Sequence, residues 1–280
     1  MRIIISVKKF LDRYKKLSKS HLEDKKLKNK LKIFLFFTNI LFAIFLFEEN
    51  VSSMSVDYNT TAVKTLNTNK KVIIDREKVI YLTFDDGPNN KITKEVLDIL
   101  KENEVKATFF LIGSQIEDAE DVVKRINDEG HNIGLHTYTH KYKNIYCSED
   151  KFIQEMIDCR NEINKVVGIS PNIIRFPGGS YKHLNSNYLK KLHDNNFKIY
   201  DWNLDNTDGL NPKFSPYKLY RKAIKGSKDL PNIILLMHCT DMHKNTCKAL
   251  PQIIEYYKSQ GYEFKTITED TPELYFSIKK

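Results

Sequence analysis

Short apolar runs alternate with segments of helical periodicity from residue 77 onward, and this alternation restricts the fold more than any other feature. The strand-like run Val79–Phe84 precedes Ile92, Val96, Ile99 and Leu100, whose i, i+4, i+7, i+8 spacing predicts one face of a helix. Further strand-like runs are Ala107–Ile112, Ile133–Leu135, Ile173–Phe176, Ile199–Asn203, Ile233–Met237 and Glu263–Ile267, with helices expected near 117–129 and 149–167. Such alternation predicts an α/β fold with a parallel sheet, either open and doubly wound or closed as a barrel. Seven or more strands in about 200 residues favour a barrel-like closure.

Positive charge is concentrated at the N-terminus. Residues 1–32 contain twelve Lys and Arg against three acidic residues, so the remaining 248 residues have 33 of each sign. The body of the chain therefore has no basic excess for a phosphate backbone, and we expect no nucleic-acid partner.

The apolar run Ile33–Phe47 predicts a transmembrane anchor or the core of a signal peptide. As a helix its fifteen residues rise only about 22 Å, which is short for a hydrocarbon core of about 30 Å. No clear small-residue cleavage site follows it, so we favour an uncleaved anchor over a cleaved signal, and over a buried helix of a soluble domain. The basic side of the run predicts that 1–32 is cytoplasmic and that the rest is extracellular, beyond a linker at 48–76. A secreted protein is the alternative.

Two motifs supply groups that could bind a metal ion. Asp85 and Asp86 follow the first predicted strand and precede a Gly-Pro turn, within Thr83–Pro88. His136 and His140 are four residues apart, which we expect to place both on one face of a helical turn. With Asp86 they form a set of two histidines and one carboxylate, which leaves coordination positions open for water and substrate.

Three further segments place polar groups at the ends of later predicted strands. They are Arg175–Ser180, Asp201–Asp208 and His238 after Ile233–Met237. The glycine-rich part of Arg175–Ser180 lacks the lysine and the spacing of a phosphate-binding loop, so we expect no nucleotide cofactor. Because strand ends of a parallel barrel share one edge, these groups are expected to meet there.

These five segments, in this order, resemble the polysaccharide deacetylase domain of carbohydrate esterase family 4, the NodB-type homology domain. The resemblance covers 77–270 and leaves 271–280 as a C-terminal tail. The first two motifs match as complete strings, while Arg175–Pro177 and Leu236–His238 match the Arg-x-Pro and Leu-x-His cores of two others. The fold that this resemblance implies is a distorted (β/α) barrel.

The resemblance also implies a role for each site residue. Asp85 would be the general base, with Arg175 paired to it, while His238 would protonate the leaving amine and Asp208 would hold His238. One divalent metal ion would be bound by Asp86, His136 and His140; zinc is expected, with cobalt, nickel or manganese as alternatives. The substrate would be contacted by the backbone N–H of Gly178, by Leu236 at the acetyl methyl group and by Tyr181 at a sugar subsite.

The fourth motif departs from the family pattern. Gly209 follows Asp208 where family members usually carry a tryptophan, which together with Leu236 would form the acetyl pocket. This difference predicts a wider pocket, or one closed by another side chain, and we expect Gly209→Trp to restore a strict preference for acetyl. Trp202 is expected to pack in the core rather than to replace the missing wall.

The resemblance and the predicted outward-facing anchor together favour a metal-dependent hydrolase that removes N-acetyl groups from a cell-wall polysaccharide, above all from the amino sugars of peptidoglycan. The alternatives are a deacetylase of O-acetylated glycans or chitooligosaccharides, another metal-dependent hydrolase, and a degenerate glycan-binding domain. The expected partners are therefore an acetylated glycan and a membrane.

The remaining cysteines and histidines carry weaker predictions. Disulfides between Cys239 and Cys247 or between Cys147 and Cys159 cannot be established from sequence, and Cys239 is expected to be a packed free thiol. Four histidines outside the motifs are expected on the surface or in loops: His131, His183, His193 and His243.

Overall fold

The computed structural model describes residues 77–278. The predicted anchor at 33–47 and linker at 48–76 lie outside the described residues and stay predictions. Within residues 77–278, no helix combines the length and apolar character needed to cross a bilayer.

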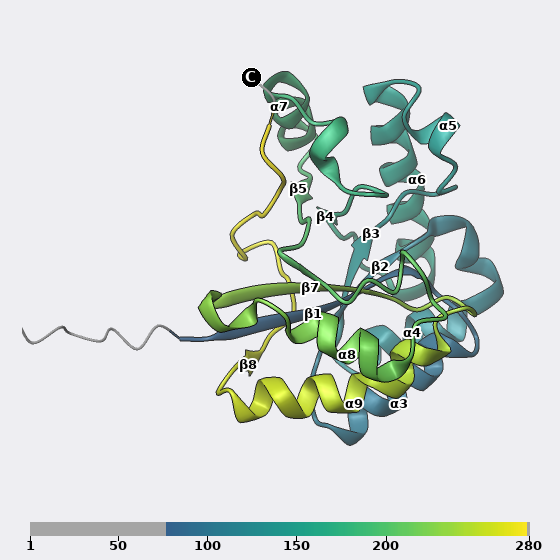
Figure 1. The fold of residues 1–280 in the computed structure, drawn as a ribbon. Coiled ribbons are helices and arrows are strands. Elements are labelled where there is room, and N and C mark those ends of the chain that lie inside the picture. Colours follow the sequence, from purple (N-terminus) through teal and green to yellow (C-terminus); the bar gives the residue numbers. More distant parts are fainter. Residues whose placement is uncertain (1–76, 279–280) are drawn as a thin grey trace, which may run out of the picture. The chain divides into compact units, whose positions relative to one another are not determined.

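The described domain is built on one parallel sheet with β1 (Val79–Gly87) at its centre. The strands follow the order β5-β4-β3-β2-β1-β7-β6, and β8 pairs with the first residues of β1. Figure 1 shows β7 lying along β1 over its length. The other strands are β2 (Thr108–Leu111), β3 (Asn132–Leu135), β4 (Ile173–Ile174), β5 (Lys198–Ile199), β6 (Leu204–Asp205), β7 (Asn232–His238) and β8 (Glu263–Phe264).

The two edge strands of the sheet are neighbours in sequence. β5 pairs with β4, and β6 pairs with β7 on the opposite side, yet only residues 200–203 separate them. This connection joins the two edges, so the sheet curves into a half-barrel. The parallel α/β prediction is confirmed in this form. Of the single strand predicted at Ile199–Asn203, only Ile199 lies in a strand, β5, and the next strand, β6, begins after the predicted range.

The last described residues cover the edge of β5. Tyr200 pairs with Leu274, and the backbone N–H of Asp201 donates to the Leu274 carbonyl at 2.6 Å. The Phe276 N–H donates to the Asp201 carboxylate at 2.8 Å. Residues 271–278 therefore pack onto the barrel, beyond the domain end that the resemblance implied.

Amphipathic helices cover the outside of the sheet. The face of α3 formed by Ile92, Val96 and Leu100 is buried, as its spacing predicts. Figure 1 shows α3, α8 and α9 gathered on one side of β1 and β7. The longer helices are α3 (Ile92–Glu102), α4 (Glu120–Asp128), α6 (Glu149–Val167), α7 (Ser186–Asp194), α8 (Pro216–Ile224) and α9 (Lys244–Ser259), with short turns α5 (Tyr142–Ile145) and η3 (Ser180–Lys182).

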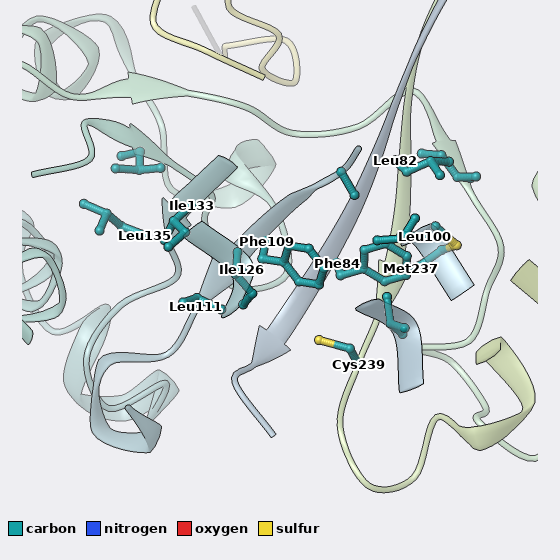
Figure 2. Packing of buried hydrophobic residues seen from close by; sticks show 14 of the residues in the cluster. Leu82, Phe84, Leu100, Phe109, Leu111, Ile126, Ile133, Leu135, Met237 and Cys239 are labelled. Atoms are coloured by element: carbon teal, nitrogen blue, oxygen red, sulfur yellow. The ribbon is translucent and has the colours of Figure 1, made fainter. Parts of the chain in front are cut away.

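The core beneath these helices is formed by apolar side chains of the central strands. Phe84 of β1 and Phe109 of β2 stack with ring centroids 5.3 Å apart. Figure 2 shows Leu100, Ile126 and Met237 gathered around this pair. This packing fixes the central strands whose carboxyl ends carry the candidate site.

Candidate active site

The predicted site residues lie at the carboxyl ends of neighbouring strands. Asp85 and Asp86 are near the end of β1, His136 directly follows β3, Arg175 directly follows β4 and His238 ends β7. Asp85 and His238 are paired directly across β1 and β7. Parallel strands direct their carboxyl ends to the same edge, so the fold brings these groups together.

Asp85 is held by a buried arginine. Arg175 Nη1 donates to Asp85 Oδ1 at 2.8 Å, and the whole Arg175 side chain is inaccessible to solvent. Arg175 also donates to Thr83 Oγ1 at 2.8 Å and to the Tyr200 carbonyl at 2.7 Å, and its guanidinium lies 4.1 Å from the centroid of the Phe110 ring. These contacts fix Oδ1 of Asp85, and Oδ2 faces His136, with 3.9 Å to His136 Nε2.

Asp86, His136 and His140 form a set that fits a metal ion. Asp86 Oδ1 lies 3.4 Å from His136 Nε2 and 3.3 Å from His140 Nε2, and it is buried with no hydrogen-bond partner among the described residues. A buried carboxylate oxygen without a partner is costly, and a cation at this point would satisfy it. The donor set of two imidazoles and one carboxylate is suited to zinc or a similar divalent ion.

The protonation of this set also suits metal binding. His136 Nδ1 lies 2.9 Å from the Arg175 carbonyl, which selects the tautomer whose Nε2 lone pair faces Asp86. Burial lowers the pKa of His140, so a neutral imidazole is favoured there. Burial alone would raise the pKa of Asp86, but the close imidazoles of His136 and His140 hold it well below its ordinary value.

His136 and His140 meet in a loop, so the predicted helical turn is wrong. Thr137 and His140 have φ values of 69° and 54°, which no α-helical turn contains. Glu155 of α6 holds the loop, because its Oε2 accepts from the backbone N–H groups of Tyr138 at 3.1 Å and Thr139 at 2.7 Å. Sequence reasoning missed Glu155, although a glutamate on the buried face of a predicted helix is an unusual position for a charge.

Asp208 and His238 form a hydrogen-bonded pair. His238 Nδ1 lies 2.7 Å from Asp208 Oδ1. The other oxygen, Asp208 Oδ2, accepts from the backbone N–H of His238 at 3.0 Å and from Thr246 Oγ1 at 2.7 Å. Burial alone would lower the pKa of His238, but the hydrogen bond and charge of Asp208 raise it to about 9. A protonated imidazole at neutral pH is what a general acid requires.

Of the predicted substrate contacts, Gly178 has the most defined surroundings. Its φ is 75°, and a Cβ there would lie 2.9 Å from the Tyr142 hydroxyl, so the position requires glycine. Within residues 77–278 its N–H donates no hydrogen bond. Leu236 pairs with Thr83 of β1, two residues before His238 on the same face of β7. Tyr181 lies on η3 with an exposed side chain, and its sugar-binding role stays a prediction.

Gly209 lies against the imidazole of His238, and this corrects our expectation for Gly209→Trp. A Cβ at position 209 would be 2.6 Å from His238 Cε1 and 3.2 Å from each ring nitrogen. His238 is tethered through Asp208, so it cannot move away without losing that hydrogen bond. A tryptophan at position 209 would therefore displace the candidate acid instead of closing an acyl pocket.

We expect Gly209→Ala to lower kcat by about tenfold to a hundredfold, because misplacement of a reacting group by about 1 Å has an effect of this order. The backbone at this glycine is outside the positive-φ region, so folding should be affected little. The measurement is kcat together with the thermal midpoint. Wild-type kcat in Gly209→Ala would contradict the close approach to His238.

Several weaker predictions are also decided by the structure. All four cysteines are free, and Cys239 is a packed thiol as predicted. Trp202 packs against Phe276 and the interior cluster, also as predicted. His131 and His243 lie in loops, as the prediction allowed, but both side chains are buried.

The fold and the site together define a polysaccharide deacetylase. Residues 73–197 match the profile of the polysaccharide deacetylase family. A peptidoglycan-N-acetylglucosamine deacetylase of Bacillus cereus is 34% identical over 232 residues, which cover 80% of this chain and 81% of that protein. The chain therefore belongs to the polysaccharide deacetylase family, and the resemblance found in the motifs is confirmed.

Two solved structures share the fold, and a further relative in sequence is named for a different sugar. The crystal structure of a Bacillus cereus polysaccharide deacetylase has a TM-score of 0.65 at 35% identity, over 72% of this chain and 96% of that chain. The catalytic domain of a peptidoglycan N-acetylglucosamine deacetylase from Eubacterium rectale has a TM-score of 0.66 at 31% identity, over 72% of this chain and 94% of that chain. A peptidoglycan-N-acetylmuramic acid deacetylase of Bacillus subtilis is 34% identical over 200 residues, 69% of this chain and 72% of that protein.

Proposed function

We propose that this chain hydrolyses the N-acetyl groups of peptidoglycan, with N-acetylglucosamine as the sugar and one divalent metal ion, zinc, as the cofactor. The observation that carries the proposal is the buried, unpartnered Asp86 Oδ1 between His136 Nε2 and His140 Nε2, beside the Asp85–Arg175 pair. The choice of sugar is supported by the names of the Bacillus cereus and Eubacterium rectale relatives. The Bacillus subtilis relative makes N-acetylmuramic acid the second candidate.

In this reaction a water oxygen bonds to the acyl carbon, the C–N bond breaks, and acetate and a free amine leave. A divalent ion held by Asp86, His136 and His140 would supply a Lewis acid that acidifies water and polarises a carbonyl oxygen. Asp85 takes the proton of the attacking water, because Arg175 occupies only its Oδ1 and Oδ2 faces the histidines, 3.9 Å from His136 Nε2. The two adjacent aspartates can thus divide metal binding and proton transfer between them.

Two further groups of the chain act on the charges that develop. The free N–H of Gly178 donates to the oxyanion, an interaction typically worth about 10²–10³ in rate. His238, protonated below its pKa of about 9, transfers its proton to the departing nitrogen. Asp208 keeps this imidazole charged and hydrogen-bonded at Nδ1, which leaves Nε2 for the substrate.

Chelation is expected to abolish acetate release from acetylated glucosamine oligomers, and added Zn²⁺ or Co²⁺ should restore it. The reason is that Asp86, His136 and His140 form a set of metal ligands in which Asp86 Oδ1 has no hydrogen-bond partner among the described residues. The measurement is acetate release against metal content. Full activity in the metal-free protein would contradict the role of these three residues.

The sugar is tested separately with defined muropeptides and chitooligosaccharides. The metal-loaded protein should lower the mass of N-acetylglucosamine residues in peptidoglycan fragments by one acetyl group. Deacetylation of N-acetylmuramic acid alone, or of chitooligosaccharides alone, would keep the enzyme class and overturn the substrate. Release from O-acetylated glycans alone would overturn the N-deacetylase proposal.

A further inference from the structure

The candidate general acid His238 is packed against a second imidazole, that of His243. The two rings are stacked, with centroids 5.2 Å apart and an angle of 22° between their planes. His243 immediately precedes α9 and is only 4% exposed. Its Nδ1 lies 2.8 Å from Thr240 Oγ1, so the orientation of its ring is fixed independently of His238.

The three contacts of the His238 ring leave one nitrogen open. Asp208 is bonded at Nδ1, Gly209 lies against Cε1, and His243 covers a face of the ring. Nε2 has no hydrogen-bond partner among the described residues and is the atom left for a substrate. A single hydrogen bond at Nδ1 would still let the ring pivot about that bond, and a stacked neighbour opposes this motion.

We propose that His243 is a positioning residue, whose ring holds the His238 imidazole in the orientation that directs Nε2 toward the leaving nitrogen. The inference rests on the proposed function, since it deepens the role of His238. It goes beyond the family motifs, because His243 belongs to none of them. Small errors in the placement of a proton donor have large effects on rate, so such a contact has a measurable consequence.

A second metal site is the competing interpretation of the same residues. The donor atoms of Asp208, His238 and His243 lie within 4.8 Å of one another, a spacing that could hold an ion. However, the Asp208 oxygens already accept three hydrogen bonds, and His243 Nδ1 is paired with Thr240. Both Asp208 oxygens and the Nδ1 atom of each histidine thus have partners within the chain, in contrast to Asp86 Oδ1, so the contacts favour a packed ring over a second ion.

The test compares His243→Phe, which keeps a planar ring, with His243→Ala, which removes it. In the metal-loaded protein we expect His243→Phe to keep kcat within about threefold of wild type. His243→Ala should lower kcat by about tenfold to a hundredfold while KM stays within about twofold, because orientation and not binding is lost. Metal content should remain one equivalent in all three proteins. If His243→Ala fails to fold, His243→Leu replaces it with the same expectation.

The other outcomes overturn the inference. Wild-type kcat in folded His243→Ala would show that the ring positions nothing. A loss in His243→Phe equal to that in His243→Ala would assign the effect to imidazole chemistry. Loss of a second metal equivalent in His243→Phe would establish the competing metal site.

A readout without substrate separates this inference from the proposed function. The ¹⁵N resonances of the His238 ring should report one ordered imidazole in wild type and His243→Phe, and exchange broadening in His243→Ala. This difference is expected even if peptidoglycan proves not to be the substrate. Identical ring spectra in all three proteins would overturn the positioning role, whereas absence of acetate release in wild type would overturn only the proposed function.

Discussion

Replacing Asp85 by Asn should lower kcat by about 10²–10⁴, the usual contribution of a general base, while the protein keeps its metal ion. The amide keeps the size of the carboxylate and can still accept from Arg175 through its oxygen, but it cannot take a proton from water. Arg175 retains Thr83 and the Tyr200 carbonyl as partners, so the fold should survive with a lower thermal midpoint. The measurements are kcat, metal content and the melting temperature.

Asp86→Asn is the matched variant, one residue away with the same change of chemistry. It should lose the metal ion, because it removes the carboxylate that lies within 3.4 Å of the Nε2 atoms of both His136 and His140. Added metal at high concentration should recover part of its activity but none of that lost in Asp85→Asn. Equal metal loss in the two variants would show that the roles of the aspartates are assigned wrongly.

The second large effect is expected for Asp208→Asn, read as a shift of the pH profile. Asp208 raises the pKa of His238 to about 9, and burial alone would lower it. Without this carboxylate, only the charges of Asp85 and Asp86 oppose the effect of burial, so the pKa should fall to near the ordinary value of about 6.5 and the alkaline limb of kcat/KM should move down by about two units. At pH 8 the candidate acid would be largely deprotonated, and activity there should fall by about tenfold to a hundredfold.

Stability should change in the same variant with a defined sign. The folded-state pKa of His238 lies above its unfolded value, so its charge stabilises the folded wild type fully below about pH 6.5. That contribution is lost as pH rises through about 9. Asp208→Asn should remove this dependence between pH 6.5 and 9, which urea unfolding at several pH values would measure. An unchanged alkaline limb together with unchanged stability would contradict the Asp208–His238 pair.

Asp205→Asn provides the control for Asp208→Asn. Asp205 is a nearby carboxylate whose Oδ1 accepts from the Thr207 N–H, and it makes no hydrogen bond to His238. Removing its charge should shift the alkaline limb by less than about half a unit. A shift as large as that of Asp208→Asn would mean that general loss of negative charge, and not the direct bond, controls His238.

The main features of the fold and the order of the site groups could be predicted from the sequence because they are encoded locally. Apolar alternation identified every described strand except β6, and the motifs stand near strand ends. The helix at 149–167 was predicted with the bounds that the structure has. Once strands are known to be parallel, the groups at their ends have to meet, so Asp85 and His238 could be expected side by side.

The failed predictions depend on contacts between distant segments. The His136–His140 loop takes its shape from Glu155 on a later helix, and its spacing alone suggested a helical turn. The close approach of Gly209 to His238 joins a loop to a strand end 29 residues later. His243 is a loop residue, as predicted, but nothing in its sequence neighbourhood shows that its ring is buried against His238.

The pairing of β1 with β7 has a consequence for when this site can exist. Thr83 and Leu235 are bonded across 152 residues, and β1 carries the candidate base whereas β7 carries the candidate acid. Closing so long a loop costs conformational entropy before any contact compensates for it, which makes such topologies slow to assemble. During synthesis β1 leaves the ribosome long before β7, and the segment that covers the edge of β5 follows β7. The candidate base and the candidate acid can therefore meet only after β7 has been synthesised and has paired with β1.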